Sequence, residues 1–338
     1  RRRFTLKENA ESIFNDLLND KKLATKRGDD ESFAYGRIPF NIPQLDKITN
    51  GGIPRKRFTL LFGGWSSGKS YIASQLCKSV QEDGGVPMWI DLEKSWDPAW
   101  MEKVGVDITK ILVADPATAE ESFKVAQKGL RSGVDLIVLD SAAGIIPADI
   151  FNNDKGIDYS PIAWQSRTWN QMLIRLLPDL TYGSSLVAIN QTRGAMGPVT
   201  AMETMPGGEG QKFFSHCCMQ VSKGGWINEP SSSTNRVGFE IKVKLLKDKF
   251  GGEKWEEVVV PFRVEGGVDI VETYVRLGLE YGLIKQTGAW YTYEKMPSKV
   301  AGINKVVDWF KENPEEYEVF KDETEKFYTT RESNSKSS

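Results

Sequence analysis

Histidine, cysteine and long hydrophobic runs are scarce in this sequence. Of the 338 residues, one is a histidine, His216, and three are cysteines. A single histidine excludes the usual zinc sites and most histidine-based catalysis, so we expect His216 to be structural. The cysteines lack metal-ligand spacing, and Cys217 and Cys218 should alternate across a strand. Scarce cysteine favours a reducing, cytoplasmic compartment, and without an apolar run of about 18 residues we expect no membrane span.

A large excess of either charge is also missing. The net charge is −2, and apolar and charged residues make up 40% and 27% of the chain, as in a globular protein. Many nucleic-acid-binding domains are basic, so this net charge weakly disfavours nucleic acid as a partner. Local loops can still supply phosphate contacts, and the overall charge therefore decides little.

The first 35 residues are predicted to form a helix and a linker. Apolar side chains within residues 4–22 recur at helical spacing, at Ile13, Phe14, Leu17 and Leu18. Residues 26–32 are polar, which is typical of a linker. A segment this short buries little apolar surface alone, so we expect it to mediate oligomerisation by packing on a neighbouring subunit.

Residues 36–268 are predicted to form an α/β core. Short apolar runs alternate with helical stretches, which indicates a mainly parallel sheet covered by helices on both faces. The expected strands are 57–63, 86–93, 110–116, 135–140 and 185–191, and the expected helices lie near 69–82, 119–131 and 163–180. Closely spaced strands over residues 217–267 predict an antiparallel extension of the same sheet.

Residues 269–330 are predicted to form a small α+β domain. Residues 269–282 should be helical, and Trp290, Tyr291 and Tyr293 should lie on a strand. Two further helices are expected over residues 299–311 and 315–327. The polar tail, residues 331–338, is expected to be disordered.

The strongest local motif is GGWSSGKS at residues 63–70, which fits G-x-x-x-x-G-K-[ST]. It lies between an apolar strand and a helix, the context in which backbone N–H groups and a helix N-terminus bind phosphate. Lys69 would reach the β- and γ-phosphates of ATP, and the Ser70 hydroxyl would coordinate Mg²⁺. The alternative is a glycine-rich turn that binds no ligand.

Three of the expected strands end in polar side chains that suit nucleotide hydrolysis. Asp140 ends LIVLD and would be the second magnesium ligand, or else a helix cap. Glu93 ends VPMWIDLE and could orient or deprotonate the attacking water, although spacing alone does not rank it above Asp91. Gln191 ends SLVAINQ and could sense the γ-phosphate, since a long loop rich in glycine, proline and methionine follows it.

These elements, in this order, resemble the RecA family of recombinases. The resemblance covers roughly residues 35–320 and includes RIPFNIPQLDKITNGGIPRKR, WIDLEKSWDPAWMEKVGVD, DLIVLDSAAGIIP and AINQTR. LLKDK is similar to a strand at the family's subunit interface. GLIKQTGAWYTYE with VVDWFKENPE resembles the bacterial C-terminal domain, which gathers duplex DNA and distinguishes bacterial and phage members from archaeal and eukaryotic ones.

The resemblance implies a cytoplasmic, DNA-dependent ATPase of DNA recombination and repair. Such a protein forms head-to-tail helical filaments on single-stranded DNA and pairs this strand with homologous duplex DNA. In this sequence the implied catalytic residues are Lys69, Glu93, Gln191, Lys247 and Lys249. The last two would reach across the filament interface to ATP in the neighbouring subunit.

ATP and Mg²⁺ are the implied cofactors, with Ser70 and Asp140 as the metal ligands. Asp97 and Trp100 match the positions at which the family contacts adenine. The predicted nucleotide-binding residues are Gly63, Ser66, Ser67, Gly68, Lys69, Ser70, Tyr71, Asp97, Trp100 and Asp140.

Two loops, residues 148–165 and 192–211, are expected to face the filament axis and DNA. Phosphate contacts from such loops give affinity without sequence preference. Apolar side chains there could wedge between bases, or simply pack under the loop. The predicted DNA-binding residues are Ile162, Arg167, Arg193, Met196, Gly207, Gly208 and Lys212.

Two departures indicate a divergent member of the family, of phage or plasmid type. Gly64 and Trp65 stand where the bacterial P-loop has Pro-Glu, and the second loop has few basic residues.

Two other functions remain alternatives. A hexameric helicase would share the ATPase core, but the N-terminal helix and the C-terminal resemblance disfavour it. A RecA-like accessory protein would bind DNA without exchanging strands, and would not need the intact nucleotide motifs.

Overall fold

The computed structural model describes residues 6–20, 22–23, 25–30, 33, 36–144, 161–192, 205–229, 234–252 and 255–335; the side chains of 6–10, 161–165 and 328–335 are outside this description. The chain divides into two compact units, residues 1–36 and 37–338. None of the described helices combines the length and the apolar character needed to cross a bilayer.

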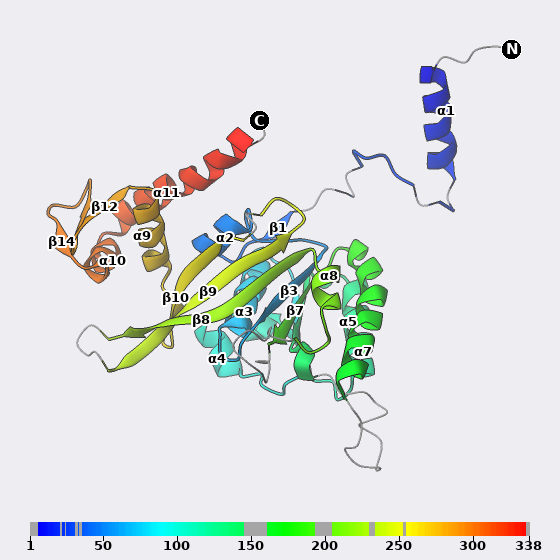
Figure 1. The fold of residues 1–338 in the computed structure, drawn as a ribbon, viewed down its shortest axis with the longest axis horizontal. Helices are drawn as coiled ribbons and strands as arrows, with labels where there is room; N and C mark the ends of the chain where they lie inside the picture. The colour runs from blue at the N-terminus through cyan, green and yellow to red at the C-terminus, as the bar shows by residue number, and fades with distance from the viewer. Residues whose placement is uncertain are drawn as a thin grey trace, which may run out of the picture. The chain divides into compact units, whose positions relative to one another are not determined.

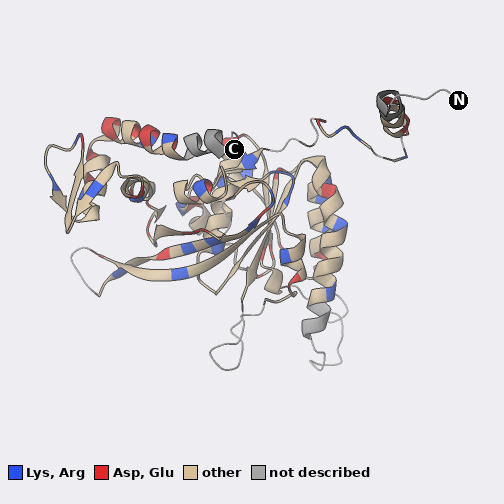
Figure 2. Cartoon of the chain, turned by 45° about the horizontal axis from the view of Figure 1, so that its top comes forward, with Lys and Arg blue, Asp and Glu red and all other residues tan. Residues whose placement is uncertain are grey.

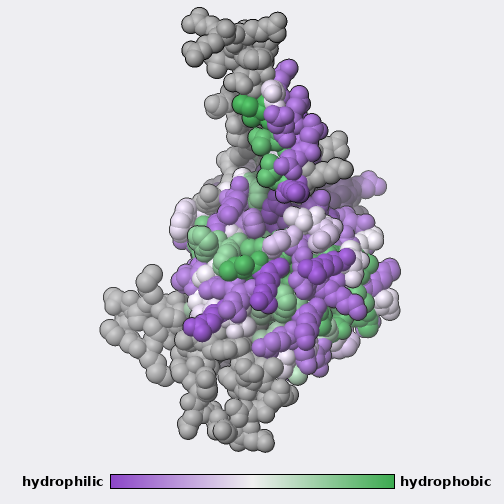
Figure 3. All heavy atoms as spheres, turned by 90° about the vertical axis from the view of Figure 1, so that its right-hand side faces the viewer, coloured by the Kyte–Doolittle hydropathy of each residue, from purple (hydrophilic) through white to green (hydrophobic). Residues whose placement is uncertain are grey.

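The first unit contains helix α1, Leu6–Asn19, where the apolar spacing predicts it. Hydrophobic and hydrophilic side chains lie on different sides of this helix (Figure 3). The apolar side chains of Ile13, Phe14 and Leu17 are about half exposed, at 52%, 53% and 44%. Within its own unit, α1 therefore leaves an apolar stripe uncovered.

The second unit is built on a large sheet whose described strands number nine (Figure 1). Their order is β11-β10-β9-β8-β3-β7-β6-β4-β5. Five of them form the predicted parallel part, namely β3 (Phe58–Gly63), β4 (Pro87–Asp91), β5 (Leu112–Ala114), β6 (Leu136–Asp140) and β7 (Ser185–Gln191). Each lies within a predicted strand. For β3, β4, β6 and β7 the continuous apolar run fits a strand covered on both faces, whereas the edge strand β5 leaves Leu112 and Val113 exposed.

The remaining strands of the large sheet are β8 (Cys217–Asn228), β9 (Arg236–Asp248), β10 (Glu257–Arg263) and β11 (Gly267–Val268). Strand β8 pairs parallel with β3, and the antiparallel extension begins only with β9. The apolar run CCMQVS, residues 217–222, covers only the first half of β8. The strand continues past Gly224 and Gly225 because the register of β8 and β9 shifts between Lys223 and Trp226, where the two glycines fall.

Helices cover both faces of this sheet, as predicted (Figure 1). One hydrophobic cluster joins the strands to α2 (Pro43–Ile48), α3 (Lys69–Glu82) and α4 (Pro98–Lys103). The other joins them to α5 (Ala119–Arg131) and α7 (Pro161–Leu176). Cys217 belongs to the first cluster and Cys218 to the second, so the two cysteines do alternate across β8. The fold class is therefore confirmed.

Several smaller elements accompany this core. Strands β1 (Arg37–Ile38) and β2 (Ile53–Pro54) form a short antiparallel pair. The short helix α8, Gly210–Phe214, precedes β8. Helix α7 ends at Leu176, earlier than the predicted residue 180, and a 3₁₀ helix, Leu177–Tyr182, replaces its last turn. Pro178 accounts for this change, because proline disfavours α-helical backbone in the residue before it.

The C-terminal part has its own hydrophobic cluster. It contains α9 (Ile270–Glu280), β12 (Ile284–Thr287), β13 (Trp290–Tyr293), β14 (Val300–Ala301), α10 (Ile303–Glu312) and α11 (Pro314–Ser335). Helix α10 begins four residues later than predicted, since β14 and Gly302 occupy the expected start. Residues 331–335, predicted to be disordered, continue α11, because no proline or glycine interrupts them. Acidic residues are frequent along α11 (Figure 2).

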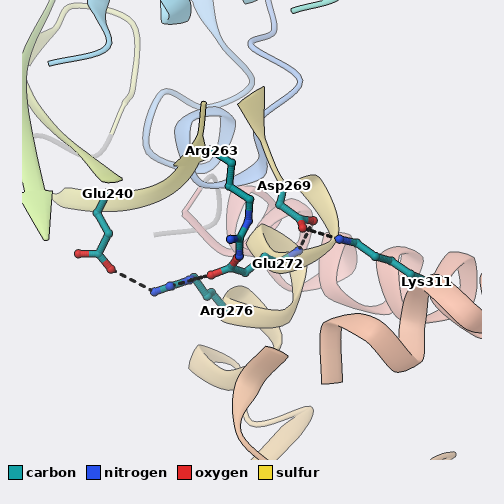
Figure 4. A network of polar contacts seen from close by, with 6 residues as sticks. All are labelled: Glu240, Arg263, Asp269, Glu272, Arg276 and Lys311. Carbon is teal, nitrogen blue, oxygen red and sulfur yellow. Dashed lines mark hydrogen bonds and ion pairs between the residues drawn. The ribbon is translucent and has the colours of Figure 1, made fainter. Parts of the chain in front are cut away.

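A polar network joins this part to strands β9 and β10 of the large sheet (Figure 4). Glu272 on α9 is 3% exposed and accepts hydrogen bonds from Arg263 on β10 and Arg276 on α9. Asp269 caps the start of α9 and forms an ion pair of 2.6 Å with Lys311 on α10. The first turn of α9 is therefore held from the sheet and from α10 at the same time.

Candidate nucleotide-binding site

The P-loop connects the end of β3 to the start of α3, as the motif predicts. Gly68 has a φ of +98°, and a Cβ atom there would lie 2.5 Å from Cδ1 of Ile241. A Cβ atom on Gly63 would lie 1.8 Å from the backbone oxygen of Val221. Only glycine fits at these two positions, since one needs a left-handed backbone and both are in close contact with β8 or β9.

Lys69 lies over this loop. Its ammonium group donates to the carbonyl oxygens of Gly63, at 3.1 Å, and Gly64, at 2.6 Å. Burial lowers the pKa of Lys69, while the carboxylates of Asp140 and Glu93 oppose this shift. A phosphate in the loop would give this buried cation an anionic partner in place of two neutral carbonyls.

Ser70 and Asp140 lie together at the pocket wall, with Ser70 Oγ donating to Asp140 Oδ2 at 2.8 Å. The pKa of Asp140 is raised to about 7, mainly by burial and also by the neighbouring Glu93 and Asp91, while the hydrogen bond from Ser70 acts in the opposite direction. Hydroxyl and carboxylate oxygens are ligands that Mg²⁺ prefers, and a cation would relieve this crowding of carboxylates. The pair therefore fits a magnesium ion.

No three histidine, cysteine, aspartate or glutamate side chains in the described part of the chain lie together so that they could hold a metal. Nucleotide-bound Mg²⁺ usually takes one or two protein ligands and completes its shell with phosphate and water. Ser70 and Asp140 correspond to that smaller ligand set.

The structure separates the roles of Asp91 and Glu93. Asp91 is 3% exposed and accepts the backbone N–H groups of Glu93, at 3.3 Å, and Trp96, at 2.8 Å. It is thus used to hold the turn after β4. The Glu93 carboxylate instead accepts hydrogen bonds from the Ser141 hydroxyl and from the Gln191 amide, the latter at 2.7 Å. Glu93 is therefore the better placed of the two to act on a ligand.

These side chains line one pocket of about 300 Å³. Most of the predicted nucleotide-binding residues meet there, together with two predicted catalytic residues, Glu93 and Gln191; the former are Ser66, Ser67, Gly68, Lys69, Ser70, Tyr71 and Asp140, whereas Gly63 does not line the pocket. Two aromatic residues that the sequence reasoning missed, Trp65 and Phe239, also line it. Trp65 lies inside the motif and could have been included, whereas Phe239 on β9 reaches the pocket only through the pairing of distant strands.

Two predicted adenine contacts do not line this pocket. Asp97 is the N-cap of α4, where its carboxylate accepts from the N–H groups of Ala99 and Trp100. The Trp100 ring packs edge-on against Phe262, with centroids 6.2 Å apart. Their contact with adenine remains a prediction.

The predicted trans-acting lysines also lie outside this pocket. Lys247, on β9, donates through Nζ to the carbonyl oxygens of Lys212, at 2.9 Å, and Phe213, at 2.8 Å. Lys249 directly follows β9, and its backbone N–H donates to the carbonyl of His216. Neither lysine lines the pocket of its own subunit, and their action on a neighbouring subunit remains a prediction.

The predicted DNA-binding residues are only partly described. Arg193, Met196 and the side chain of Ile162 lie outside the described residues. Arg167 is exposed on α7. Gly207 and Gly208 form a turn with φ values of +80° and +71°, and Lys212 on α8 pairs with Glu209 at 3.0 Å. Their contact with DNA remains a prediction.

His216 has a structural position. Its Nδ1 atom accepts the backbone N–H of Phe58 at 3.3 Å, and its ring stacks on Phe250. Burial lowers its pKa to about 4, with smaller contributions from nearby cations. The ring is therefore neutral near pH 7 and serves as an acceptor within the fold.

A glycine-rich loop between a strand and a helix, with a lysine, a serine and a carboxylate converging on one pocket, defines a P-loop nucleotide-binding protein. Comparison with known sequences identifies the family within this class. The sequence model of the RecA N-terminal domain matches residues 23–268. The chain therefore belongs to the RecA family, which confirms the predicted P-loop ATPase and ATP-dependent recombinase.

Bacterial RecA proteins are similar to this chain over most of its length. It is 33% identical over 269 residues to "Protein RecA" of Thermus aquaticus, covering 78% of this chain and 77% of the relative. It is 32% identical over 278 residues to that of Frankia alni, covering 79% and 77%. It is also 32% identical over 294 residues to that of Francisella philomiragia, covering 86% and 78%. Identity is thus modest and coverage high.

Proposed function

We propose that this chain assembles into helical filaments on single-stranded DNA and pairs that strand with homologous duplex DNA, with ATP and Mg²⁺ as cofactors. The observation that carries the proposal is the contact between Glu93, the candidate base, and Gln191, the candidate sensor, inside the P-loop pocket. Gln191 ends β7, and the predicted second DNA-binding loop follows it directly. The contact therefore lies between the nucleotide and the segment predicted to hold DNA.

Lys69 and the backbone N–H groups of Gly68 and its neighbours would bind the phosphates, and Ser70 and Asp140 would hold Mg²⁺. When bound there, Mg²⁺ would neutralise charge on the phosphates. Glu93 would orient the attacking water and accept its proton, while Lys69 would stabilise negative charge on the transferred phosphoryl group.

Gln191 would act as the switch. Its amide donates to Glu93 here, so a γ-phosphate acceptor in the same pocket would compete with that carboxylate for the amide. The amide would bind the γ-phosphate before hydrolysis and return to Glu93 afterwards. Because β7 leads into the second loop, this exchange of hydrogen-bond partners would alter the contacts of that loop with DNA.

Filament assembly would complete the site. Lys247 and Lys249 would act in trans on ATP of the neighbouring subunit, as an arginine finger does. The half-exposed apolar stripe of α1 would pack on a second copy of the chain. Arg167, Arg193 and Lys212 would contact DNA phosphates without reading sequence.

The test is ATP hydrolysis by the full chain with and without single-stranded DNA, for the wild type and for Lys247→Ala. We expect strong stimulation by DNA in the wild type. The variant should lose the stimulation while its monomer still binds nucleotide, because the missing group belongs to the neighbour's site. Normal stimulated turnover in Lys247→Ala would rule out the trans lysine, and DNA-independent hydrolysis in the wild type would favour an accessory protein.

A further inference from the structure

The segment that connects the nucleotide pocket to Lys247 contains a buried pair of amides. Asn190 and Gln211 are both 0% exposed, and Asn190 Nδ2 donates to Gln211 Oε1 at 3.0 Å. Both amides also donate to the carbonyl oxygen of Pro206, at 2.7 Å from Asn190 and 2.8 Å from Gln211. Neither residue lines the nucleotide pocket, and the catalytic steps described above do not use them.

On one side, this pair is attached to the sensor. Asn190 directly precedes Gln191 on β7, and its Oδ1 atom accepts the backbone N–H of Gln191 at 2.8 Å. The side chain of Gln191 points into the pocket and bonds Glu93. A change in the position of Gln191 therefore acts directly on the Asn190 amide.

On the other side, the pair is attached to α8. Gln211 is the second residue of this short helix, and two carbonyls in its C-terminal half, on Lys212 and Phe213, accept hydrogen bonds from the ammonium group of Lys247. A cation is favoured at this end of a helix, where carbonyl oxygens lack partners within the helix. The orientation of α8 thus sets where Lys247 is held.

Helix α8 has little freedom to move independently of this pair. A Cβ atom on Gly207 would lie 2.3 Å from Gln211 Nε2 and 2.7 Å from the Trp169 ring, and one on Gly210 would lie 2.1 Å from Asn170 Oδ1. The turn before α8 and the first residue of α8 are therefore packed against α7 and Gln211. Packed elements of this kind move between discrete arrangements rather than deform continuously.

We propose that Asn190 and Gln211 are positioning residues that transmit nucleotide occupancy from the pocket of one subunit to Lys247, and so to the ATP site of the next subunit. Gln191, Asn190, Gln211 and α8 form the route within one subunit, and Lys247 carries the signal across the interface. This proposal rests on the proposed function, in which Lys247 acts in trans.

The test compares wild type, Gln211→Met and a matched control, Gln44→Met, each as the full chain on single-stranded DNA. Methionine keeps the volume of glutamine and removes its amide. Gln44 is also a buried glutamine, 4% exposed, and its amide donates to the backbone carbonyl of Thr273. It lies on α2, away from the proposed route. The rate of ATP hydrolysis is measured over a range of ATP concentrations, together with nucleotide binding without DNA and thermal unfolding.

We expect sigmoidal ATP dependence in the wild type and in Gln44→Met. Coupling of ordinary size corresponds to a roughly 5- to 150-fold difference in ATP affinity between the first and later subunits, and we expect Gln211→Met to reduce it below about twofold. Nucleotide binding without DNA should stay unchanged in Gln211→Met, since Gln211 does not line the pocket. Asn190→Leu provides a second variant if Gln211→Met does not fold. The double variant should lose no more coupling than either single variant, because both act in one route.

Several outcomes would overturn the proposal while leaving the proposed function intact. The first is DNA-stimulated hydrolysis with hyperbolic ATP dependence in the wild type. The second is unchanged cooperativity in Gln211→Met or, where that variant does not fold, in Asn190→Leu. The third is a loss of cooperativity in Gln44→Met equal to that in Gln211→Met. Absence of DNA-stimulated hydrolysis in the wild type would instead overturn the proposed function, and this proposal with it.

Discussion

The single residues of the pocket, and of the buried amide pair beyond it, form two groups: those that a sequence motif identifies and those that only the folded structure brings together. Lys69, Ser70 and Asp140 were predicted from sequence, because their chemistry depends on a loop or on the end of one strand. Spacing alone does not rank Glu93 above Asp91, and the family resemblance selects Glu93; the structure adds a physical reason, since Asp91 accepts two backbone N–H groups of its own turn. Phe239, Asn190 and Gln211 could not be predicted, because nothing local indicates their partners.

Glu93 is the residue on which hydrolysis should depend most. Glu93→Gln keeps the shape of the side chain and its hydrogen-bond acceptor but removes the base. We expect nucleotide binding to persist and kcat to fall by about 100- to 10,000-fold. Single-turnover hydrolysis on single-stranded DNA, compared with nucleotide binding by the same variant, measures both quantities. A fall of less than about threefold would mean that the base lies elsewhere.

His216 should make the fold sensitive to acid. Its pKa is lowered from 6.5 to about 4 in the folded chain, so between these values the unfolded state binds more protons than the folded state. The wild type should therefore lose stability as the pH falls from about 6.5 to about 4. In His216→Gln this contribution is absent, and urea unfolding across that range should show a shallower pH dependence. Parallel pH profiles for the two proteins would contradict the assignment.

Among the elements, those whose pattern is local were predicted most closely. The expected bounds 69–82 and 119–131 agree with α3 and α5, since each begins and ends where the apolar periodicity does. Less local features escaped prediction. β8 pairs parallel with β3 and runs through two glycines to Asn228, because its partner β9, and not its own sequence, determines how far the ladder extends.

The contact between the P-loop and β8 gives a sharp test at this scale. In Gly63→Ala, the new methyl group would meet the backbone oxygen of Val221, so β3 and β8 must separate locally. We expect a loss of about 1–3 kcal/mol in the free energy of unfolding, with weaker nucleotide binding. Gly64→Ala is the matched control, since a Cβ atom there meets nothing within 4 Å. Equal stabilities of the two variants by denaturant unfolding would show that the contact is unimportant.

At the scale of the whole molecule, ion pairs join the ATPase core to the small C-terminal part. The sequence alone does not indicate which charged residues form these pairs. Arg263, Glu272 and Arg276 come from a strand and a helix, and only their packing shows that Glu272 is buried between two arginines (Figure 4). In the outer pair, Asp269 and Lys311, the lysine side chain is 49% exposed and the aspartate side chain 13% exposed. The two contacts should therefore differ in their contribution to stability.

Removing Glu272 should cost far more than removing Lys311. Glu272→Ala leaves two arginines without their shared buried partner, and we expect a loss of about 3 kcal/mol in the free energy of unfolding. Lys311→Ala breaks a partly solvated ion pair and should cost less than about 1 kcal/mol. Urea denaturation of both variants measures the difference. A smaller loss in Glu272→Ala than in Lys311→Ala would be inconsistent with the network described.

The most direct test of the recombinase assignment is a strand-exchange assay with the full chain, circular single-stranded DNA and homologous linear duplex DNA. With ATP and Mg²⁺, we expect joint molecules that resolve into a nicked circle and a displaced strand. None should form with non-homologous duplex or with Lys69→Ala. DNA-stimulated ATP hydrolysis without any joint molecules would contradict the assignment and identify the chain as an accessory protein that binds DNA without exchanging strands.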